Sequence, residues 1–185
     1  MEDRQQFYDS FAEKLEQALL QQCCSNGLLE DRLLTSYDID QRWDKGLGEP
    51  FCADAVKEFN GYPEATLSWA AYLGMAVARQ WDKDWKRYKD ADYASYCGKA
   101  GFDDLDEHVT RDILGIPLNS AKAAGLADTL QALACAVISL IRHEGIEYQT
   151  IEAYYILLKS LRVMYRIGAA LELRELGYKF VPVGE

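Results

Sequence analysis

The sequence predicts an all-α protein, a compact helical bundle of about four long helices plus two or three short helices, forming one domain over residues 1–185. Apolar residues recur at spacings of three and four, and the strict alternation typical of a strand is nearly absent. The four prolines lie outside the strongly periodic segments. A chain of 185 residues is long enough to bury one sizeable core, so a single domain is expected.

Four long segments have the periodicity of helices, and glycine or asparagine residues mark where three of the four end. They run from about Asp3 to Cys24, from Pro63 to Trp85 or Tyr88, from Asn119 or Ser120 to about His143, and from Glu147 or Thr150 to Leu176. In the first of these, one face is expected to carry Phe7, Phe11, Leu15, Ala18 and Leu19.

Shorter helical segments are expected between the long ones. One of them has acidic residues in its first turn and Asp103 as its N-cap. Residues 45–48 read as a loop, and residues 179–185 as a loose or extended tail. The expected short helices or turns are Tyr37–Trp43, Phe51–Phe59, Asp92–Cys97 and Asp103–Leu114.

Residues 65–78 contain no charged side chain, so a helix there must be surrounded by protein. Ala70, Gly74 and Ala78 fall every fourth residue on one stripe, where a neighbouring helix can approach closely. Residues 130–141 and the last helix are also widely apolar. We therefore expect three buried helices, covered by the first helix as the fourth.

The end of the second long helix carries an aromatic stripe of Trp81, Trp85 and Tyr88. The stripe either packs on neighbouring segments or forms a surface for a protein partner, since exposed Trp and Tyr are enriched at interfaces. Between residues 79 and 92, five basic side chains stand against four acidic ones. The resulting net charge of +1 is too small for this segment to bind along a nucleic acid backbone, so no nucleic acid partner is expected.

A basic strip of Lys159, Arg162 and Arg166 lies on one side of the last helix, at spacings of three and four. Its cations are expected either to pair with acids of an adjacent helix, such as those of residues 104–112, or to form an anion-binding site for a carboxylate or phosphate.

Asp104, His108 and Asp112 are spaced four apart and are the best candidates for metal ligands. A metal-dependent hydrolase is therefore one hypothesis, with His143 and Glu144 as further ligands. Glu172 and Glu175 form a carboxylate pair, but a matching pair on a neighbouring helix is not evident. Nucleotide-binding and triad motifs are also lacking in the sequence.

The net charge and the cysteine content limit which classes of partner and which cellular compartment are expected. A net charge of −10 disfavours nucleic acid and anionic membranes, and neither apolar run is as long as a membrane span. Five cysteines without paired spacing, after a charged N-terminus, favour the cytoplasm. The leading hypothesis is a helical binding protein without a cofactor, whose partner is another protein or a second copy of itself. The metal-dependent hydrolase and an anion-binding regulator are the alternatives.

Overall fold

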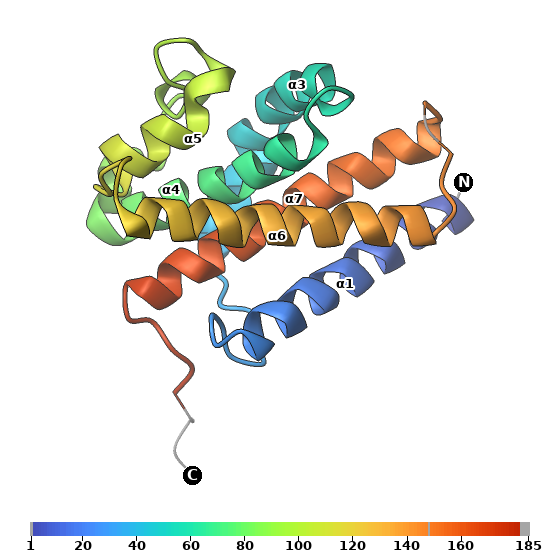
Figure 1. Cartoon of the computed structure of the whole chain (residues 1–185), viewed down its shortest axis with the longest axis horizontal. Helices are drawn as coiled ribbons and strands as arrows, with labels where there is room; N and C mark the ends of the chain where they lie inside the picture. Colours follow the sequence, from blue (N-terminus) through green and yellow to red (C-terminus); the bar gives the residue numbers. More distant parts are fainter. Residues whose placement is uncertain (1, 148, 182–185) are drawn as a thin grey trace.

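The computed structural model describes residues 2–147 and 149–181, and all regular structure in these ranges is helical. The all-α, single-domain prediction is confirmed. The four longest helices are α1 (Glu2–Ser25), α4 (Pro63–Tyr88), α6 (Ala121–His143) and α7 (Ile151–Glu175) (Figure 1). The shorter segments are α2 (Tyr37–Arg42), η1 (Trp43–Leu47), α3 (Gly48–Phe59), η2 (Tyr93–Ser95), η3 (Phe102–Asp104), α5 (Leu105–His108) and η4 (Val109–Ile113).

The centre of the molecule is the contact between α4 and α7, the most extensive contact of any two elements. At Gly74 a methyl group would lie 1.9 Å from the carbonyl oxygen of Tyr165, and at Gly168 it would lie 2.0 Å from that of Ala71. The two backbones touch at two glycines, so neither position accepts a side chain. Ala70, Gly74 and Ala78 are all buried, as the small-residue stripe predicts.

α1 packs along α7 and α6 and closes one side of the core. Its buried residues are Tyr8, Phe11, Leu15, Leu19 and Cys23. Phe7, with 41% of its surface exposed, and Ala18 lie outside this face, which corrects the prediction for these two residues. Phe11, Leu15 and Leu19 keep the predicted face, but its first buried residue is Tyr8 rather than Phe7, because Tyr8 stacks on Tyr155 of α7 at 5.2 Å between ring centroids.

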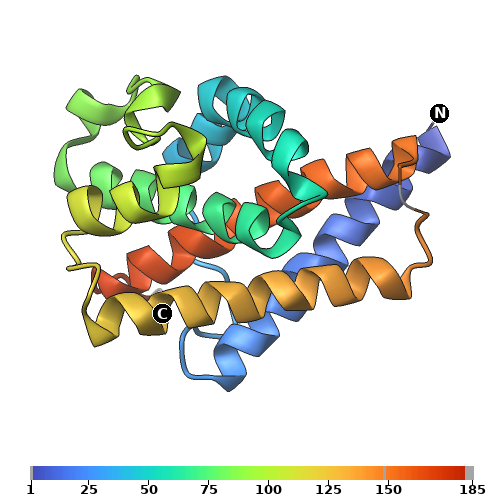
Figure 2. The ribbon, with the colours of Figure 1, turned by 45° about the horizontal axis from the view of Figure 1, so that its top comes forward.

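The region between α1 and α4 folds as α2, a tight turn and α3, packed on α4 and α7 (Figure 2). Lys45 and Gly46 leave helical geometry, and Gly46 has a φ of 127° that suits glycine. This interruption agrees with the expected loop over 45–48. Trp43 then packs against Tyr165 at 5.0 Å, which ties the turn to the core.

The segment from 102 to 113 is helical, as expected, but it is built of three short pieces rather than one helix. Asp103 is not its N-cap, because the chain first makes the short turn η3, and Asp104 then precedes α5 without a side-chain cap bond. By contrast, Ser120 and Thr150 cap α6 and α7 through hydrogen bonds from the backbone N–H groups of Ala123 and Ala153.

α4 is interrupted near its end, where Asp84 has φ −167° and ψ 86°. The carboxylate of Asp84 accepts a hydrogen bond from the backbone N–H of Arg87, three residues later. This is the geometry of an N-cap, so Asp84 starts a new turn that contains Trp85 and Tyr88. The continuous helix expected over this segment is therefore wrong at Asp84.

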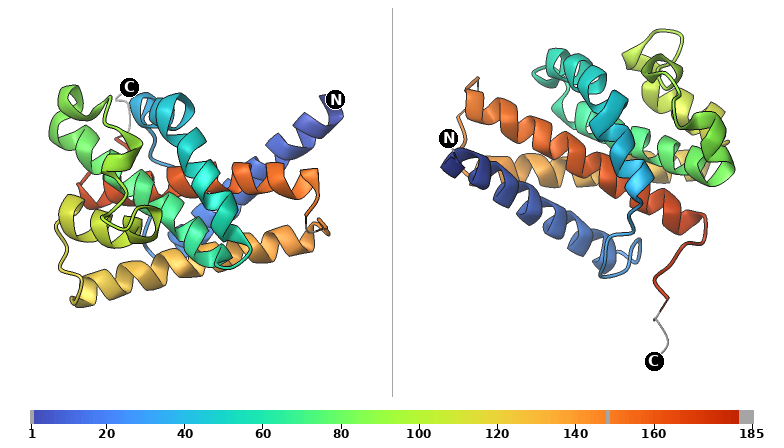
Figure 3. Two further views of the ribbon diagram at one scale, coloured as in Figure 1. Left: turned by 90° about the horizontal axis from the view of Figure 1, so that it is seen from above. Right: turned by 180° about the vertical axis from the view of Figure 1, so that it is seen from behind.

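α6 differs most from the expected core of three buried helices. It lies along one edge of the molecule and buries one side, through Leu130, Leu133 and Val137 (Figure 3). Only 28% of its most apolar stretch is buried. α6 is also the one helix of the described residues that is long and apolar enough to span a bilayer, a property that core helices share. The tail over residues 179–181 has no regular structure, and 182–185 lie outside the described residues.

Candidate functional site

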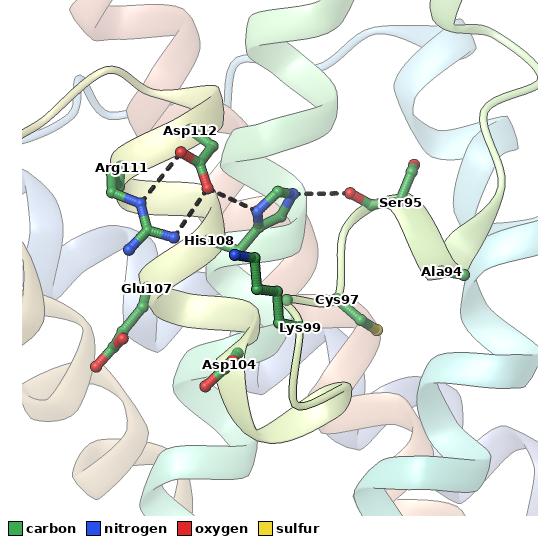
Figure 4. Close-up of a pocket in the computed structure, with 10 residues that line it drawn as sticks. Ala94, Ser95, Cys97, Lys99, Asp104, Glu107, His108, Arg111 and Asp112 are labelled. Carbon is green, nitrogen blue, oxygen red and sulfur yellow. Dashed lines mark hydrogen bonds and ion pairs between the residues drawn. The ribbon is translucent and has the colours of Figure 1, made fainter.

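An open, polar pocket of about 810 Å³ contains the three predicted metal ligands, Asp104, His108 and Asp112 (Figure 4). The pocket lies where the turn over residues 94–99 faces α5 and η4. Lys99 and Arg111 add positive charge to its walls, so the pocket holds charges of both signs.

His108 is held at both ring nitrogens. Nδ1 lies 2.9 Å from a carboxylate oxygen of Asp112, and Nε2 lies 2.9 Å from the carbonyl oxygen of Ser95. The hydrogen bond from Arg111, followed by that from His108, keeps the pKa of Asp112 below its ordinary value, so this carboxylate is an acceptor. Both partners of His108 are oxygen atoms, so the ring is held in place from its two sides.

The three residues do not form a metal-ligand set. The carboxylate of Asp104 accepts from the backbone N–H of Ala100 at 2.9 Å, while Asp112 is engaged by His108 and Arg111. Over residues 2–147 and 149–181, no three or more His, Cys, Asp or Glu side chains gather as a metal site requires. His143 and Glu144, the further ligands of the hypothesis, lie at the C-terminal end of α6, where Glu144 pairs with Lys14. Metal binding stays a prediction without a preformed site.

The basic strip of α7 faces α1, α2 and η1 rather than residues 104–112, so the expected pairing acids were wrong. Nζ of Lys159 lies 2.6 Å from Asp9, and Arg162 lies 3.3 Å from Asp44. Arg166 pairs with both Glu16 and Asp40. These residues line a groove of about 550 Å³. Each cation already has a carboxylate partner, so an anion binding there has to displace one.

The aromatic stripe is partly covered. Trp81, Trp85 and Tyr88 are all half-buried. The indole N–H of Trp81 donates to Asp38 at 3.1 Å, and its ring packs on Tyr178, which follows α7, at 5.6 Å. Trp81 thus joins α4 to α2 and to the tail, and the packing alternative describes it well. A partner surface on this stripe stays a prediction.

The sequence did not reveal the ion pair between Arg79 and Glu172, which joins α4 to α7. Nε of Arg79 lies 2.7 Å from Oε1 of Glu172, but the N–H is not aligned on the oxygen, and both atoms are buried without a hydrogen bond among the described residues. Only 2% of Glu172 is exposed. The signal that could have revealed this pair is that Arg79 and Glu172 are charged residues next to the apolar stretches of α4 and α7.

Burial dominates the ionisation of Glu172. It raises the pKa of this carboxyl group to about 7, because loss of hydration outweighs the attraction of Arg79. One turn further along, Lys122 lies 2.8 Å from Glu175 and lowers the pKa of that exposed carboxyl group. Two glutamates on one turn of α7 therefore have opposite environments.

The outer face of α6 is uncovered and nearly uncharged. Between Lys122 and Arg142 the only Asp, Glu, Lys or Arg is Asp128. The other exposed residues between Lys122 and Arg142 are small except for Gln131; they are Ala124, Gly125, Ala127, Gln131, Ala132, Cys135 and Ser139.

Comparisons of the chain with protein-family models, with curated proteins and with solved structures found no match. Function must therefore be argued from the geometry of these surfaces.

Proposed function

We propose that the protein is a binding protein whose partner is a second copy of itself, held through the outer face of α6. The observation behind this proposal is the contrast between the composition of α6 and its surroundings. α6 is apolar enough for a core or a bilayer, yet 28% of its most apolar stretch is buried. A helix of this kind normally has protein on both sides. A second copy supplies that missing neighbour.

The small side chains of the outer face suit a helix partner. Ala132, Cys135 and Ser139 are exposed and lie at spacings of three and four, along the seam that an adjoining helix would follow. Because these side chains are short, two α6 helices can approach closely along the seam and exclude water. Among the exposed residues between Lys122 and Arg142, Gln131 alone has one of the long polar side chains that usually solubilise an exposed helix.

Charge complementarity selects an antiparallel pair. Asp128, Cys135 and Arg142 are each seven residues apart, so they lie on nearly the same line along the helix, and all three are exposed. When two antiparallel copies meet at Cys135, Asp128 of each copy faces Arg142 of the other. Neither charge forms an ion pair within the described part of its own chain.

A bilayer fits this surface less well than a second copy. One side of α6 is packed against α4 and α1, so lipid could reach only the outer face. Asp128 lies on that face, and a carboxylate in hydrocarbon costs about 2.5–3.5 kcal/mol or more. In the antiparallel pair the same carboxylate gains an arginine.

The test is analytical ultracentrifugation of the wild type and of Ala132→Arg over a range of concentrations. Ala132 is exposed, so the change should leave the fold intact while placing a bulky cation in the seam. We expect the dimer to weaken at least about tenfold, equivalent to 1.4 kcal/mol. The control Gln21→Arg adds the same charge to an exposed position of α1 and should leave the dimer unchanged.

The register has its own test. Asp128→Arg should weaken the dimer, because each new cation would face Arg142 of the other copy. Adding Arg142→Asp in the same chain should restore association by reversing both pairs. A wild type that sediments at 21.0 kDa at every concentration, or a double variant no better than the single one, contradicts the proposal.

A further inference from the structure

A further pocket, of about 330 Å³, lies beside the N-terminal half of α4, where α5 and α6 border it. This volume is at the lower end of the range of about 300–1,000 Å³ for small-molecule sites. The pocket differs in two ways from the polar pocket at His108 and from the groove along α7. Aromatic rings form much of its wall, and the charged residues that line it are all acids.

The aromatic wall follows one side of α4. Trp69 comes seven residues after Tyr62, the N-cap of α4, and Tyr72 comes three residues after Trp69, so the three side chains share that side. Phe102 contacts the Trp69 ring edge to face, at 4.8 Å between ring centroids, and holds it in place. Tyr72 is 5% exposed and Tyr62 is 66% exposed. The wall is therefore buried at one end and open to solvent at the other.

The two acids of this pocket, Glu64 and Asp106, have no cationic partner. Both are half-buried, and neither forms an ion pair within the described part of the chain. Burial, and then the negative charge of Asp106, raises the pKa of the Tyr72 hydroxyl group to about 12, so this carboxylate acts on the aromatic wall. Both acids line the pocket and keep part of their surface open to solvent, so a molecule in the pocket can reach them. Two uncompensated negative charges beside aromatic rings favour a cation.

The chemistry of the walls also selects the kind of cation. A metal ion requires more protein ligands than two carboxylates, and the described chain contains no group of three or more His, Cys, Asp or Glu side chains that could hold one. A primary ammonium group is strongly hydrated and would exchange its water for ring faces. A methylated ammonium group suits these walls better, because it is attracted to the faces of Trp and Tyr rings.

We propose that this pocket binds a small, free organic cation that carries a methylated ammonium group. The methyl groups contact the rings of Tyr62 and Trp69. The carboxylates of Glu64 and Asp106 balance the positive charge. The site needs only one chain, because these four residues belong to α4, its N-cap and α5.

Choline and 3,3-dimethylbutan-1-ol, its neutral carbon analogue, test the ligand chemistry. Ala127 and Gln131 of α6 border the pocket, so the titrations use the Ala132→Arg variant, in which the proposed dimer is weakened. The indole N–H signal of Trp69 in the ¹⁵N-labelled protein, assigned with Trp69→Phe, reports binding. We expect choline to bind at least about fivefold more tightly than the neutral analogue. Equal affinity for the two compounds would overturn this proposal and leave the dimer, which sedimentation measures, unaffected.

A third probe separates a free compound from a modified protein side chain. Nα-acetyl-trimethyllysine amide carries the same head group as choline on a peptide unit. It should bind no more tightly than choline, because the pocket is large enough only for a small molecule. Tighter binding of this probe would overturn the assignment to a free compound.

Two pairs of variants locate the cation. Asp106→Asn should weaken choline binding at least about threefold, because it removes one charge from the lining. Asp103→Asn, which changes an exposed acid outside the lining, should have no effect. Tyr62→Leu should weaken binding by a similar factor, whereas Tyr37→Leu should not, and both tyrosines are exposed, so neither change disturbs the core. Choline binding that is unaffected by both Asp106→Asn and Tyr62→Leu would place the cation elsewhere and refute the assignment.

Discussion

At the scale of single residues, Glu172 shows that a buried ion pair need not stabilise the native state. Arg79 lies beside it, yet burial raises the pKa of the carboxyl group to about 7 from an ordinary 4.5. The native protein therefore binds more protons than the unfolded chain between these two values. Stability falls as pH rises through this window and is constant above it, as far as Glu172 is concerned. Replacing Glu172 with a neutral residue should therefore raise the free energy of unfolding at high pH.

We predict that Glu172→Gln raises the free energy of unfolding by up to about 3 kcal/mol near pH 8, since one pKa unit corresponds to about 1.36 kcal/mol. The gain should vanish at about pH 4, where wild-type Glu172 is protonated in both states. Urea unfolding at both pH values measures it.

The matched control is Glu175→Gln. Lys122 lowers the pKa of the Glu175 carboxyl group, so this change should give no gain near pH 8 and should cost a little stability instead. A Glu172→Gln variant that is less stable than the wild type near pH 8 would show that Arg79 outweighs the burial of Glu172.

At the scale of elements, the crossing of α4 and α7 depends on two glycines. A methyl group on Gly74 would lie 1.9 Å from the backbone of α7, which no rotamer change can relieve. The helices would have to move apart, and the residues around the crossing would lose their packing. Gly125 in α6 is the opposite case, because the space around it is open.

We predict that Gly74→Ala lowers the free energy of unfolding by at least about 3 kcal/mol. This exceeds the usual cost of overpacking, because the added methyl group would clash with the backbone of α7 rather than with a side chain that can move. Gly125→Ala should raise it by up to about 1 kcal/mol through helix propensity. Denaturant unfolding of the two variants measures both effects. A loss below about 1 kcal/mol for Gly74→Ala would be inconsistent with the close contact.

Local signals explain what the sequence predicted correctly among these elements. Ser120 and Thr150 cap helices through bonds to N–H groups three residues away, so their roles can be inferred from neighbouring residues alone. The small-residue stripe that contains Gly74 could likewise be predicted, because its residues all belong to one segment of the chain. Asp84 is a local signal that was missed, because charged residues on both sides of it continue the helical pattern.

Side-chain partners could not be predicted, because they depend on which helices are neighbours. Lys159 meets Asp9 from 150 residues earlier in the chain, and nothing in their spacing selects that acid over Asp104. The pairing of Arg79 with Glu172 also depends on the crossing of α4 and α7. For the basic strip, the spacing placed Lys159, Arg162 and Arg166 on one side of α7, but the acids expected to pair with them were wrong.

At the scale of the whole molecule, the described residues form four long helices, and α6 is the one of the two outer helices whose uncovered side is nearly uncharged. α4 and α7 form the centre, and α1 closes one side through large side chains such as Phe11 and Leu15. α6 covers the core with its inner side and leaves small residues outside. Composition alone could not show which side would be uncovered. The proposed antiparallel pair of α6 helices would complete the bundle across two chains.

Cross-linking at Cys135 tests this pairing most directly. Cys24 and Cys135 are the exposed cysteines of the described chain, so Cys24→Ser leaves Cys135 as the accessible thiol. With a short bismaleimide, this variant should yield a covalent species of twice 21.0 kDa at protein concentrations where Cys135→Ser, which retains Cys24, yields none. If the Cys24→Ser variant stays a single chain while its thiol reacts fully with a monofunctional maleimide, the α6 faces do not meet.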